Sequence, residues 1–130
     1  MKALLLVAHG SRRKQSNDEV VLLVDKLRNN CSQQYNIVNA AFLELAEVLI
    51  SNGIKQCVDE GASSIIVLPY FLNSGRHIVE DIPNIVNDCK VNYPDTIISI
   101  ASHLGASSLM MDLLIDSAEK AKTIPVAFEI

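Results

Sequence analysis

The sequence LLLVAHGSRRKQS, residues 4–16, joins an apolar run to a polar and strongly basic loop. The run, residues 4–8, is continuous rather than alternating, which is typical of a parallel strand that is covered on both faces. It stops at His9, and Gly10 and Ser11 follow before three basic residues. We therefore expect an α/β fold in which His9 stands directly after the first strand.

Further apolar runs occupy residues 37–43, 64–72 and 96–101, and segments with helical spacing separate them. Alternation of strand and helix favours a parallel sheet with right-handed crossovers and helices on both faces. We predict a flavodoxin-like, four-stranded sheet of order 2-1-3-4. Residues 124–130 are apolar enough to add a short strand or to pack on a partner, and their sequence does not decide between the two.

Four helices are predicted from spacing and from their end signals. Ser16 and Glu19 fit a capping box at the start of the first helix. Gly61 suits the end of the second. Asp81 is a possible cap for the third, with Pro83 in its first turn. The fourth helix takes its apolar face from Leu109, Met110, Leu113 and Leu114.

Composition and net charge indicate one domain and argue against nucleic-acid and membrane partners. The chain has 130 residues with 49% hydrophobic content, enough for one buried core, and it shows no linker or repeat, so we expect one domain over residues 1–130. Its net charge of -4 argues against a nucleic-acid partner. The basic cluster at residues 12–14 comes too early for a signal peptide, and no apolar run approaches the roughly 20 residues of a membrane span. We expect a cytoplasmic protein without a membrane partner.

The cysteines point to no metal or disulfide framework. Cys31, Cys57 and Cys89 are odd in number, have no CxxC spacing and do not neighbour a histidine in the sequence. We expect them to be small buried residues in a reducing compartment.

Polar side chains follow three of the predicted strands at their carboxyl ends. In a sheet of this order the ligand crevice lies beyond those ends, between the first and third strands. His9 follows the first strand, Glu44 the second and His77 the third. Imidazole nitrogens and carboxylate oxygens together suit Co²⁺, Ni²⁺, Fe²⁺ and Zn²⁺, and three ligands would leave coordination positions open. Each of these residues taken alone is more typical of an ordinary loop than of a functional site.

Basic residues collect near the same crevice although the chain as a whole is acidic. Arg12, Arg13, Lys14 and Arg76 follow the first and third strands, and they would attract an anionic small molecule. A solvated loop and helix start is the alternative explanation. Gly75, like Gly10, would permit backbone conformations that other residues resist and the close approach of a ligand.

Three further polar residues have simpler explanations. His103 follows the fourth strand, one strand further out, and a capping or surface role is favoured for it. Glu80 and Asp81 could assist proton removal, but acidic residues at a helix start that interact with the helix dipole are the simpler account.

Three motifs together resemble a known enzyme family. LLVAHGSR (residues 5–12), AFLELAE (residues 41–47) and LPYFLNSGRHIVEDIP (residues 68–83) are similar to the short class II tetrapyrrole chelatases, the CbiX-type sirohydrochlorin cobaltochelatases and the sirohydrochlorin ferrochelatases. The resemblance extends over residues 2–114. Family members commonly have a proline after the glutamate of the second motif, where this chain has Val48.

The resemblance implies insertion of Co²⁺, Fe²⁺ or Ni²⁺ into sirohydrochlorin, without ATP, on the path to cobalamin or sirohaem. It implies that His9 and His77 deliver the metal and remove pyrrole protons, and that Glu44, or Glu47 in its place, is the acidic ligand. The metal is then a substrate, and no cofactor is permanently bound. The ligand types do not fix which metal is used.

The carboxylates of sirohydrochlorin would give Arg12, Arg13 and Arg76 a partner. We expect the loop residues beside these arginines to contribute to the same substrate-binding surface; they are Gly10, Ser11 and Gly75. A homodimer that forms the cleft between two copies is also implied, because the macrocycle is large beside one domain.

Two other functions fit parts of the pattern. Phosphoryl transfer through His9 would suit the nearby arginines, but histidine-phosphatase sites carry an arginine immediately before the histidine, where this chain has Ala8. A metal or tetrapyrrole carrier without turnover would use the same residues, so only measured turnover separates it from an enzyme.

Overall fold

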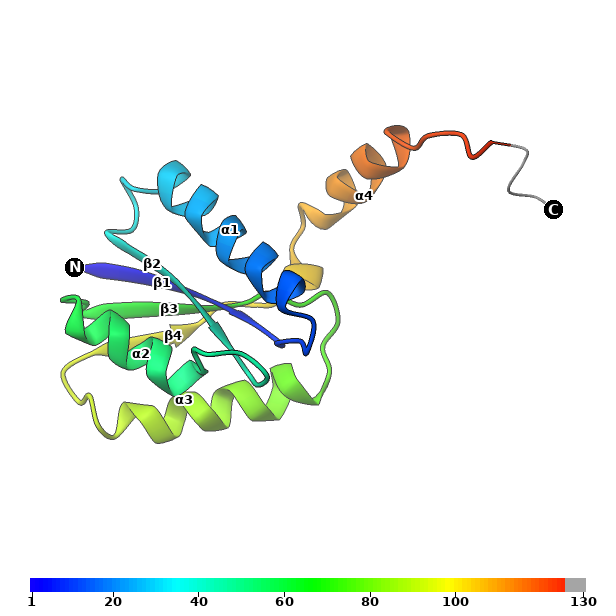
Figure 1. Ribbon diagram of the computed structural model, residues 1–130. Coiled ribbons are helices and arrows are strands. Elements are labelled where there is room, and N and C mark those ends of the chain that lie inside the picture. The colour runs from blue at the N-terminus through cyan, green and yellow to red at the C-terminus, as the bar shows by residue number, and fades with distance from the viewer. Residues whose placement is uncertain (126–130) are drawn as a thin grey trace.

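A computed structural model describes residues 1–125, and its centre is a parallel sheet between helices (Figure 1). The strands lie in the order β2-β1-β3-β4. They are β1 (Lys2–Ala8), β2 (Ile37–Phe42), β3 (Ser64–Pro69) and β4 (Ile97–Ile100). The predicted flavodoxin-like fold and strand order are confirmed.

Three strands are shorter than their apolar runs predict, β2 by one residue and β3 and β4 by more. β3 stops at Pro69, three residues before the run ends, because a proline has no N–H to donate to the next rung of the sheet. β4 pairs only with β3 at the edge of the sheet and is limited to residues 97–100. The N–H of Tyr70 still donates to Val7 on β1 (2.7 Å), and the residues after it leave the sheet as a loop.

Helices cover both faces, and the alternation along β1 divides its side chains between them (Figure 1). On one face α1 (Lys14–Asn30) packs on a cluster whose fully buried members are Leu4, Leu6, Val24 and Val38. On the other face α2 (Ile50–Asp59) and α3 (Ile82–Lys90) pack on the larger cluster. Its least exposed members are Ala3, Leu5, Val7, Ala41, Ile54, Cys57, Val67 and Ile82.

The capping box predicted at Ser16 is wrong. α1 begins two residues earlier, with Arg13 at its N-cap and no side-chain capping bond. Asn17 explains the difference, because its side chain holds the preceding loop: its Oδ1 accepts from the N–H of Ser11 (2.9 Å) and its Nδ2 donates to the carbonyl of Ser11 (2.8 Å). The loop is thereby folded back on the first turn of α1.

The end of the second helix is confirmed. Gly61 follows α2 with a φ of +107°, a left-handed conformation that favours glycine. Its N–H donates to Val58, and the N–H of Ala62 donates to Cys57. These two bonds form a Schellman motif, which satisfies carbonyl groups at the helix end.

The cap predicted at Asp81 is wrong, whereas Pro83 does lie in the first turn of α3. A π-helical turn, η1 (His77–Asp81), leads into α3 without a break, and Asp81 itself has helical φ and ψ of -67° and -49°. Since its backbone is already inside the helix, Asp81 cannot act as an N-cap, and its carboxylate is free to bind another group.

The fourth predicted helix is present as α4 (Met110–Glu119), but none of its residues is buried. Figure 1 shows it projecting from the body beyond the short helix η2 (Leu104–Ala106), the element it contacts. Leu109, Met111, Leu113, Leu114 and Ile115 are more than half exposed. Of the predicted segment 124–130, only Ile124 and Pro125 lie in the described part, and neither is in a strand.

The expected burial of the cysteines is confirmed for two of the three. All three thiols are free; Cys57 and Cys89 are buried, and Cys31 is half-buried. Burial raises the pKa of the Cys57 and Cys89 thiols.

Among residues 1–125, no helix has the length and apolar character needed to cross a membrane.

Truncation of Ile54, which is fully buried between α2 and the sheet, should destabilise the protein. We expect Ile54→Ala to lower the free energy of unfolding by about 3 kcal/mol, since it removes buried methyl groups and leaves a cavity. Leu22→Ala on α1, where Leu22 is 60% exposed, should change it by less than about 1 kcal/mol. Urea unfolding followed by circular dichroism measures both, and equal losses would contradict the layer assignment.

Candidate functional site

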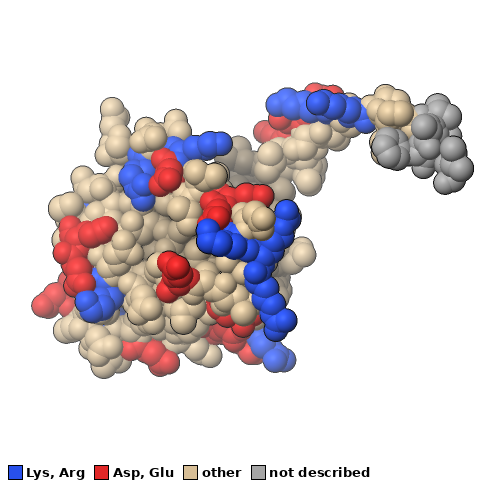
Figure 2. All heavy atoms as spheres, in the orientation of Figure 1, with Lys and Arg blue, Asp and Glu red and all other residues tan. Residues whose placement is uncertain are grey.

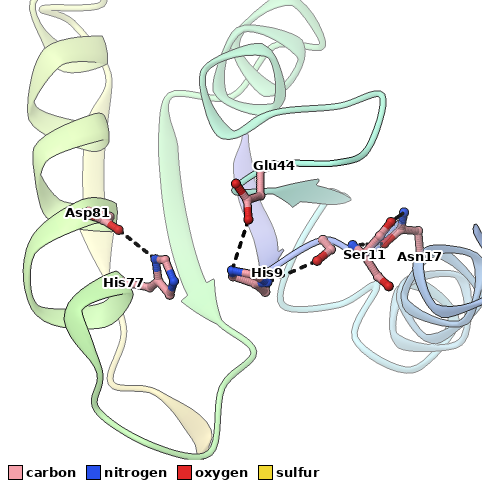
Figure 3. Close-up of polar contacts among 7 residues, drawn as sticks. His9, Ser11, Asn17, Glu44, His77 and Asp81 are labelled. Carbon is pink, nitrogen blue, oxygen red and sulfur yellow. Dashed lines mark hydrogen bonds and ion pairs between the residues drawn. The ribbon is translucent and has the colours of Figure 1, made fainter. Parts of the chain in front are cut away.

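His9, Glu44 and His77 lie together at the carboxyl edge of the sheet (Figure 3). The Nε2 atom of His9 is 3.5 Å from Oε1 of Glu44. The imidazole rings of His9 and His77 have their centroids 4.7 Å apart and are tilted by 53°. The side chains of all three are about half exposed, so the cluster is open to solvent. The structure therefore brings together the three residues predicted as ligands, while their role as ligands remains a prediction.

The His9–Glu44 contact depends on the backbone beyond the two strands. The N–H of Leu43 donates to Ala8 (3.0 Å), and the N–H of Glu44 donates to His9 (3.2 Å), so the pairing of β1 with β2 continues past both strand ends. Gly10 makes this possible: it has a φ of +93°, and a Cβ added to it would lie 1.7 Å from the carbonyl oxygen of Glu44. The close approach at Gly10 is thus to the neighbouring loop.

The loop after β2 settles which glutamate faces His9. The N–H of Phe42 donates to the carbonyl of Val48 (2.9 Å), which closes residues 43–47 into a compact loop. Leu45 at its tip has a φ of +58°, unusual for a residue with a side chain, and its carbonyl accepts from Asn17 Nδ2 (3.2 Å). Glu44 faces His9, whereas Glu47 lines a separate pocket beside the start of α1.

Asn17 thus bridges two loops that carry site residues, and sequence reasoning did not find it. Its side chain binds Ser11 in the loop after β1 (Figure 3). It also donates to the carbonyl of Leu45 in the loop after β2. An asparagine inside a helical pattern carries no signal of such a role, because the two loops are brought to it only by the fold.

The hydrogen bonds of His9 determine its tautomer. Its Nδ1 lies 3.1 Å from the carbonyl oxygen of Gly10, which can only accept, so Nδ1 carries the proton. In the neutral ring the lone pair of Nε2 therefore faces the Glu44 carboxylate. The Nε2 lone pair and the carboxylate oxygen of Glu44 are 3.5 Å apart and both carry electron density, so a cation between them is stabilising. Ligands at about 2.1 Å from a tetrahedral metal ion are separated by about 3.4 Å, so the spacing fits such an ion.

His77 is bound by a residue whose role the sequence did not predict. Its Nδ1 lies 2.7 Å from Oδ2 of Asp81, four residues later in η1 (Figure 3). The simpler account of Asp81 as an acid that stabilises the helix start is therefore incomplete. The four-residue spacing in HIVED was the available signal. π-helical turns are rare and often occur at functional sites.

The site consists of two pairs that face each other, His9 with Glu44 and His77 with Asp81. Within residues 1–125, no three side chains of His, Cys, Asp or Glu are grouped closely enough to enclose a metal ion. A pocket of about 260 Å³ adjoins the pairs on the α3 side. It is lined by Leu43, Glu44, His77, Asp81, Asn84 and Ile85.

The predicted basic residues lie in the loops around this edge. Arg12 and Arg13 are exposed, and in the described part of the chain neither guanidinium forms an ion pair. Arg76 is also exposed, with its Nε 3.7 Å from Glu80, and Lys14 pairs with Asp18. Figure 2 shows Lys and Arg side chains gathered on the side of the body where β1 and β3 end.

The remaining predicted residues have local structural roles. The Ser11 hydroxyl accepts from the N–H of Arg13 (3.0 Å). Gly75 does not use the conformational freedom that glycine permits: its φ is not left-handed, a Cβ there would meet open space, and its carbonyl accepts the first bonds of the turn after it. His103 occupies the N-cap position of η2, although its side chain makes no capping bond.

Comparisons with known proteins agree with the fold and with the motifs. A family model described as CbiX matches residues 3–121. A sirohydrochlorin cobaltochelatase of Sulfolobus acidocaldarius is 32% identical over 124 residues, which are 95% of each protein. A chloroplastic sirohydrochlorin ferrochelatase of Arabidopsis thaliana is 34% identical over 87% of this chain and 49% of its own length.

A solved structure shares the fold. The sirohydrochlorin chelatase SirB from Bacillus subtilis subspecies spizizenii, crystallised in complex with cobalt, has a TM-score of 0.79 and 28% sequence identity, with 91% of this chain and 50% of that chain covered. The chain thus spans about half the length of the Arabidopsis and Bacillus proteins and nearly all of the Sulfolobus protein.

Replacing Gly10 should disturb both the fold and the site. We expect Gly10→Ala to lower the free energy of unfolding by at least about 2 kcal/mol, because alanine is strained at this φ and its Cβ would collide with Glu44. Gly75→Ala is the matched control, because a Cβ at Gly75 would meet open space. It should change the free energy of unfolding by less than about 1 kcal/mol. Thermal and urea unfolding compare the two, and an unaffected Gly10→Ala protein would contradict the close loop contact.

Proposed function

Because the chain belongs to the CbiX family, we propose that it is a sirohydrochlorin chelatase, which inserts a divalent metal ion into that macrocycle. The observation that carries the proposal is the meeting of His9, Glu44 and His77 at the carboxyl edge of the sheet. Co²⁺ is the first candidate metal, because the relative of matching length is named a cobaltochelatase. Fe²⁺ and Ni²⁺ suit the same nitrogen and oxygen donors. No ATP is required in the proposed reaction.

The reaction exchanges two pyrrole protons of the macrocycle for one M²⁺ ion. His9 and Glu44 would bind the incoming ion through Nε2 and a carboxylate oxygen, which are separated by a distance that suits one metal ion. His77, whose ring is 4.7 Å from that of His9, would be the third ligand. A site with three protein ligands leaves positions at which pyrrole nitrogens can replace water.

Two protons must leave as the metal enters the ring. A neutral imidazole can accept a proton through the same lone pair that binds a metal, so each histidine can take up a proton when it gives up the ion. His9 and His77 therefore share metal delivery and proton removal in this proposal. Glu44 supplies negative charge that balances the ion before transfer.

Substrate binding is assigned to the basic loops. Sirohydrochlorin carries many carboxylates, and guanidinium groups bind carboxylates through paired hydrogen bonds. Arg12 and Arg13 offer exposed guanidinium groups beside the loop that carries His9, and Arg76 precedes His77. The loop residues Gly10, Ser11 and Gly75 would form the surface between these charges.

A homodimer and a cytoplasmic location complete the proposal. The chain spans only half the length of some relatives, and a second copy would supply a second wall for a large macrocycle. The apolar side chains that α4 leaves exposed offer a surface for this second copy. Free, buried thiols suit a reducing compartment.

A carrier that binds metal or tetrapyrrole without turnover is the alternative, and kinetics separates it from the enzyme. The absorbance of sirohydrochlorin should change faster with protein and Co²⁺ than with Co²⁺ alone, and likewise with Fe²⁺ without oxygen. We expect His9→Ala and His77→Ala each to lower the rate by about 100-fold or more, since both remove a ligand and a base.

Asp59→Asn is the matched control, because Asp59 pairs with Lys55 at the end of α2, before β3 begins and away from the site, and its rate should stay close to that of the wild type. A wild-type protein that binds sirohydrochlorin or Co²⁺ but does not accelerate insertion of any of the three metals would leave the carrier as the better account. Equal loss in Asp59→Asn and His9→Ala would contradict the assignment of the site.

The homodimer is tested by light scattering after size-exclusion chromatography. We expect a mass of two chains for the wild type and of one chain for Leu113→Asp combined with Leu114→Asp, because these residues on α4 are 56% and 57% exposed. Val91→Asp, at a residue that is 80% exposed at the end of α3, should remain dimeric. A wild-type monomer at micromolar concentration would overturn the proposal.

A further inference from the structure

We infer that Asp81 is a positioning residue: it holds His77 in the tautomer whose Nε2 lone pair is free to receive the metal. The inference rests on the proposed function in that it takes His77 as a metal ligand. The Asp81–His77 contact itself belongs to the structure and can be tested without turnover.

The first step is the geometry of η1. The N–H of Ile82 donates to the carbonyl of His77, five residues before it, which makes this turn wider than an α-helical one. A wider turn brings side chains four residues apart almost into line along the axis. The Asp81 carboxylate consequently lies directly against the His77 ring, with 2.7 Å between Oδ2 and Nδ1.

The second step is the proton on the ring. An ionised carboxylate can only accept hydrogen bonds, so Nδ1 of His77 must be the protonated nitrogen in this contact. The neutral ring then has its lone pair on Nε2. Metal-binding histidines commonly donate their second N–H to a carboxylate or a carbonyl group, which fixes the ring and increases its basicity.

The third step is the match with His9. There the carbonyl of Gly10 lies 3.1 Å from Nδ1 and plays the part that Asp81 plays for His77. In both neutral rings the free lone pair is therefore on Nε2. The two rings face each other with their centroids 4.7 Å apart (Figure 3). His9 is held by an uncharged group and His77 by an anion, so the two histidines are not equivalent donors.

A purely structural role for the Asp81–His77 pair is the competing account. The two side chains are 38% and 46% exposed, and an exposed pair of this kind contributes little to stability. Its removal should therefore leave the fold intact, and a change at the His77 ring would report positioning.

Nitrogen-15 NMR of the histidine rings, at a pH well above the usual histidine pKa of about 6.5, reads the tautomer directly. We expect the His77 signals of the wild type to show a proton on Nδ1. In Asp81→Ala they should shift toward the tautomer protonated on Nε2, which a histidine side chain in water prefers, while the His9 signals keep their tautomer. An unchanged His77 tautomer in Asp81→Ala would overturn the inference.

Co²⁺ binding provides a second measurement. Titration of the protein alone with Co²⁺ should show affinity about 10-fold to 100-fold lower in Asp81→Ala, with partial recovery in Asp81→Glu, which restores a carboxylate. Glu80→Gln is the matched control: it removes one negative charge from the adjacent residue, whose partner is Arg76, and should change neither the His77 tautomer nor Co²⁺ affinity. Equal losses in Glu80→Gln and Asp81→Ala would show a general charge effect and overturn the inference.

The outcomes also separate this inference from the proposed function. If the tautomer shifts in Asp81→Ala but the wild type does not accelerate metal insertion, Asp81 still positions His77 and the chelatase proposal fails. If the wild type is an active chelatase and the tautomer does not shift, the proposed function stands and the role of Asp81 is refuted.

Discussion

The contact of Gly10 with the carbonyl of Glu44 is the constraint on which the site depends. Parallel strands place their carboxyl ends at one edge, but this brings residues only into the same region. The pairing of β1 and β2 continues for two further hydrogen bonds beyond the sheet, and at Gly10 there is no room for a Cβ. His9 and Glu44 therefore begin from adjacent, hydrogen-bonded backbone, which explains how two half-exposed side chains remain in contact.

The opposite side of the site is built by different means. His77 lies in a π-helical turn that continues into α3, whose residues Ile82 and Val86 are buried against the sheet. One histidine is thus fixed by a loop folded against its neighbour and the other by a helix anchored in the core. The two imidazoles lie close together because β1 and β3 are neighbours in the sheet and both histidines follow the carboxyl ends of these strands.

The sequence was sufficient for features that repeat along the chain and insufficient for those that depend on contacts between distant loops. Continuous apolar runs predicted the strands and their order, and their polar ends located His9, Glu44 and His77. The same patterns could not find Asn17, whose role arises when two loops meet it, or the π-helical turn that carries Asp81. The capping signal at Ser16 failed for the same reason.

The fourth helix and the candidate site are both exposed to solvent. α4 has apolar side chains typical of a packed helix, yet none of its residues is buried, and its main contacts are with η2. The two histidine pairs are likewise open on one side. Relatives of twice the length have additional chain that could cover both regions, whereas the Sulfolobus relative does not. A second copy, as in the proposed homodimer, would cover both features together.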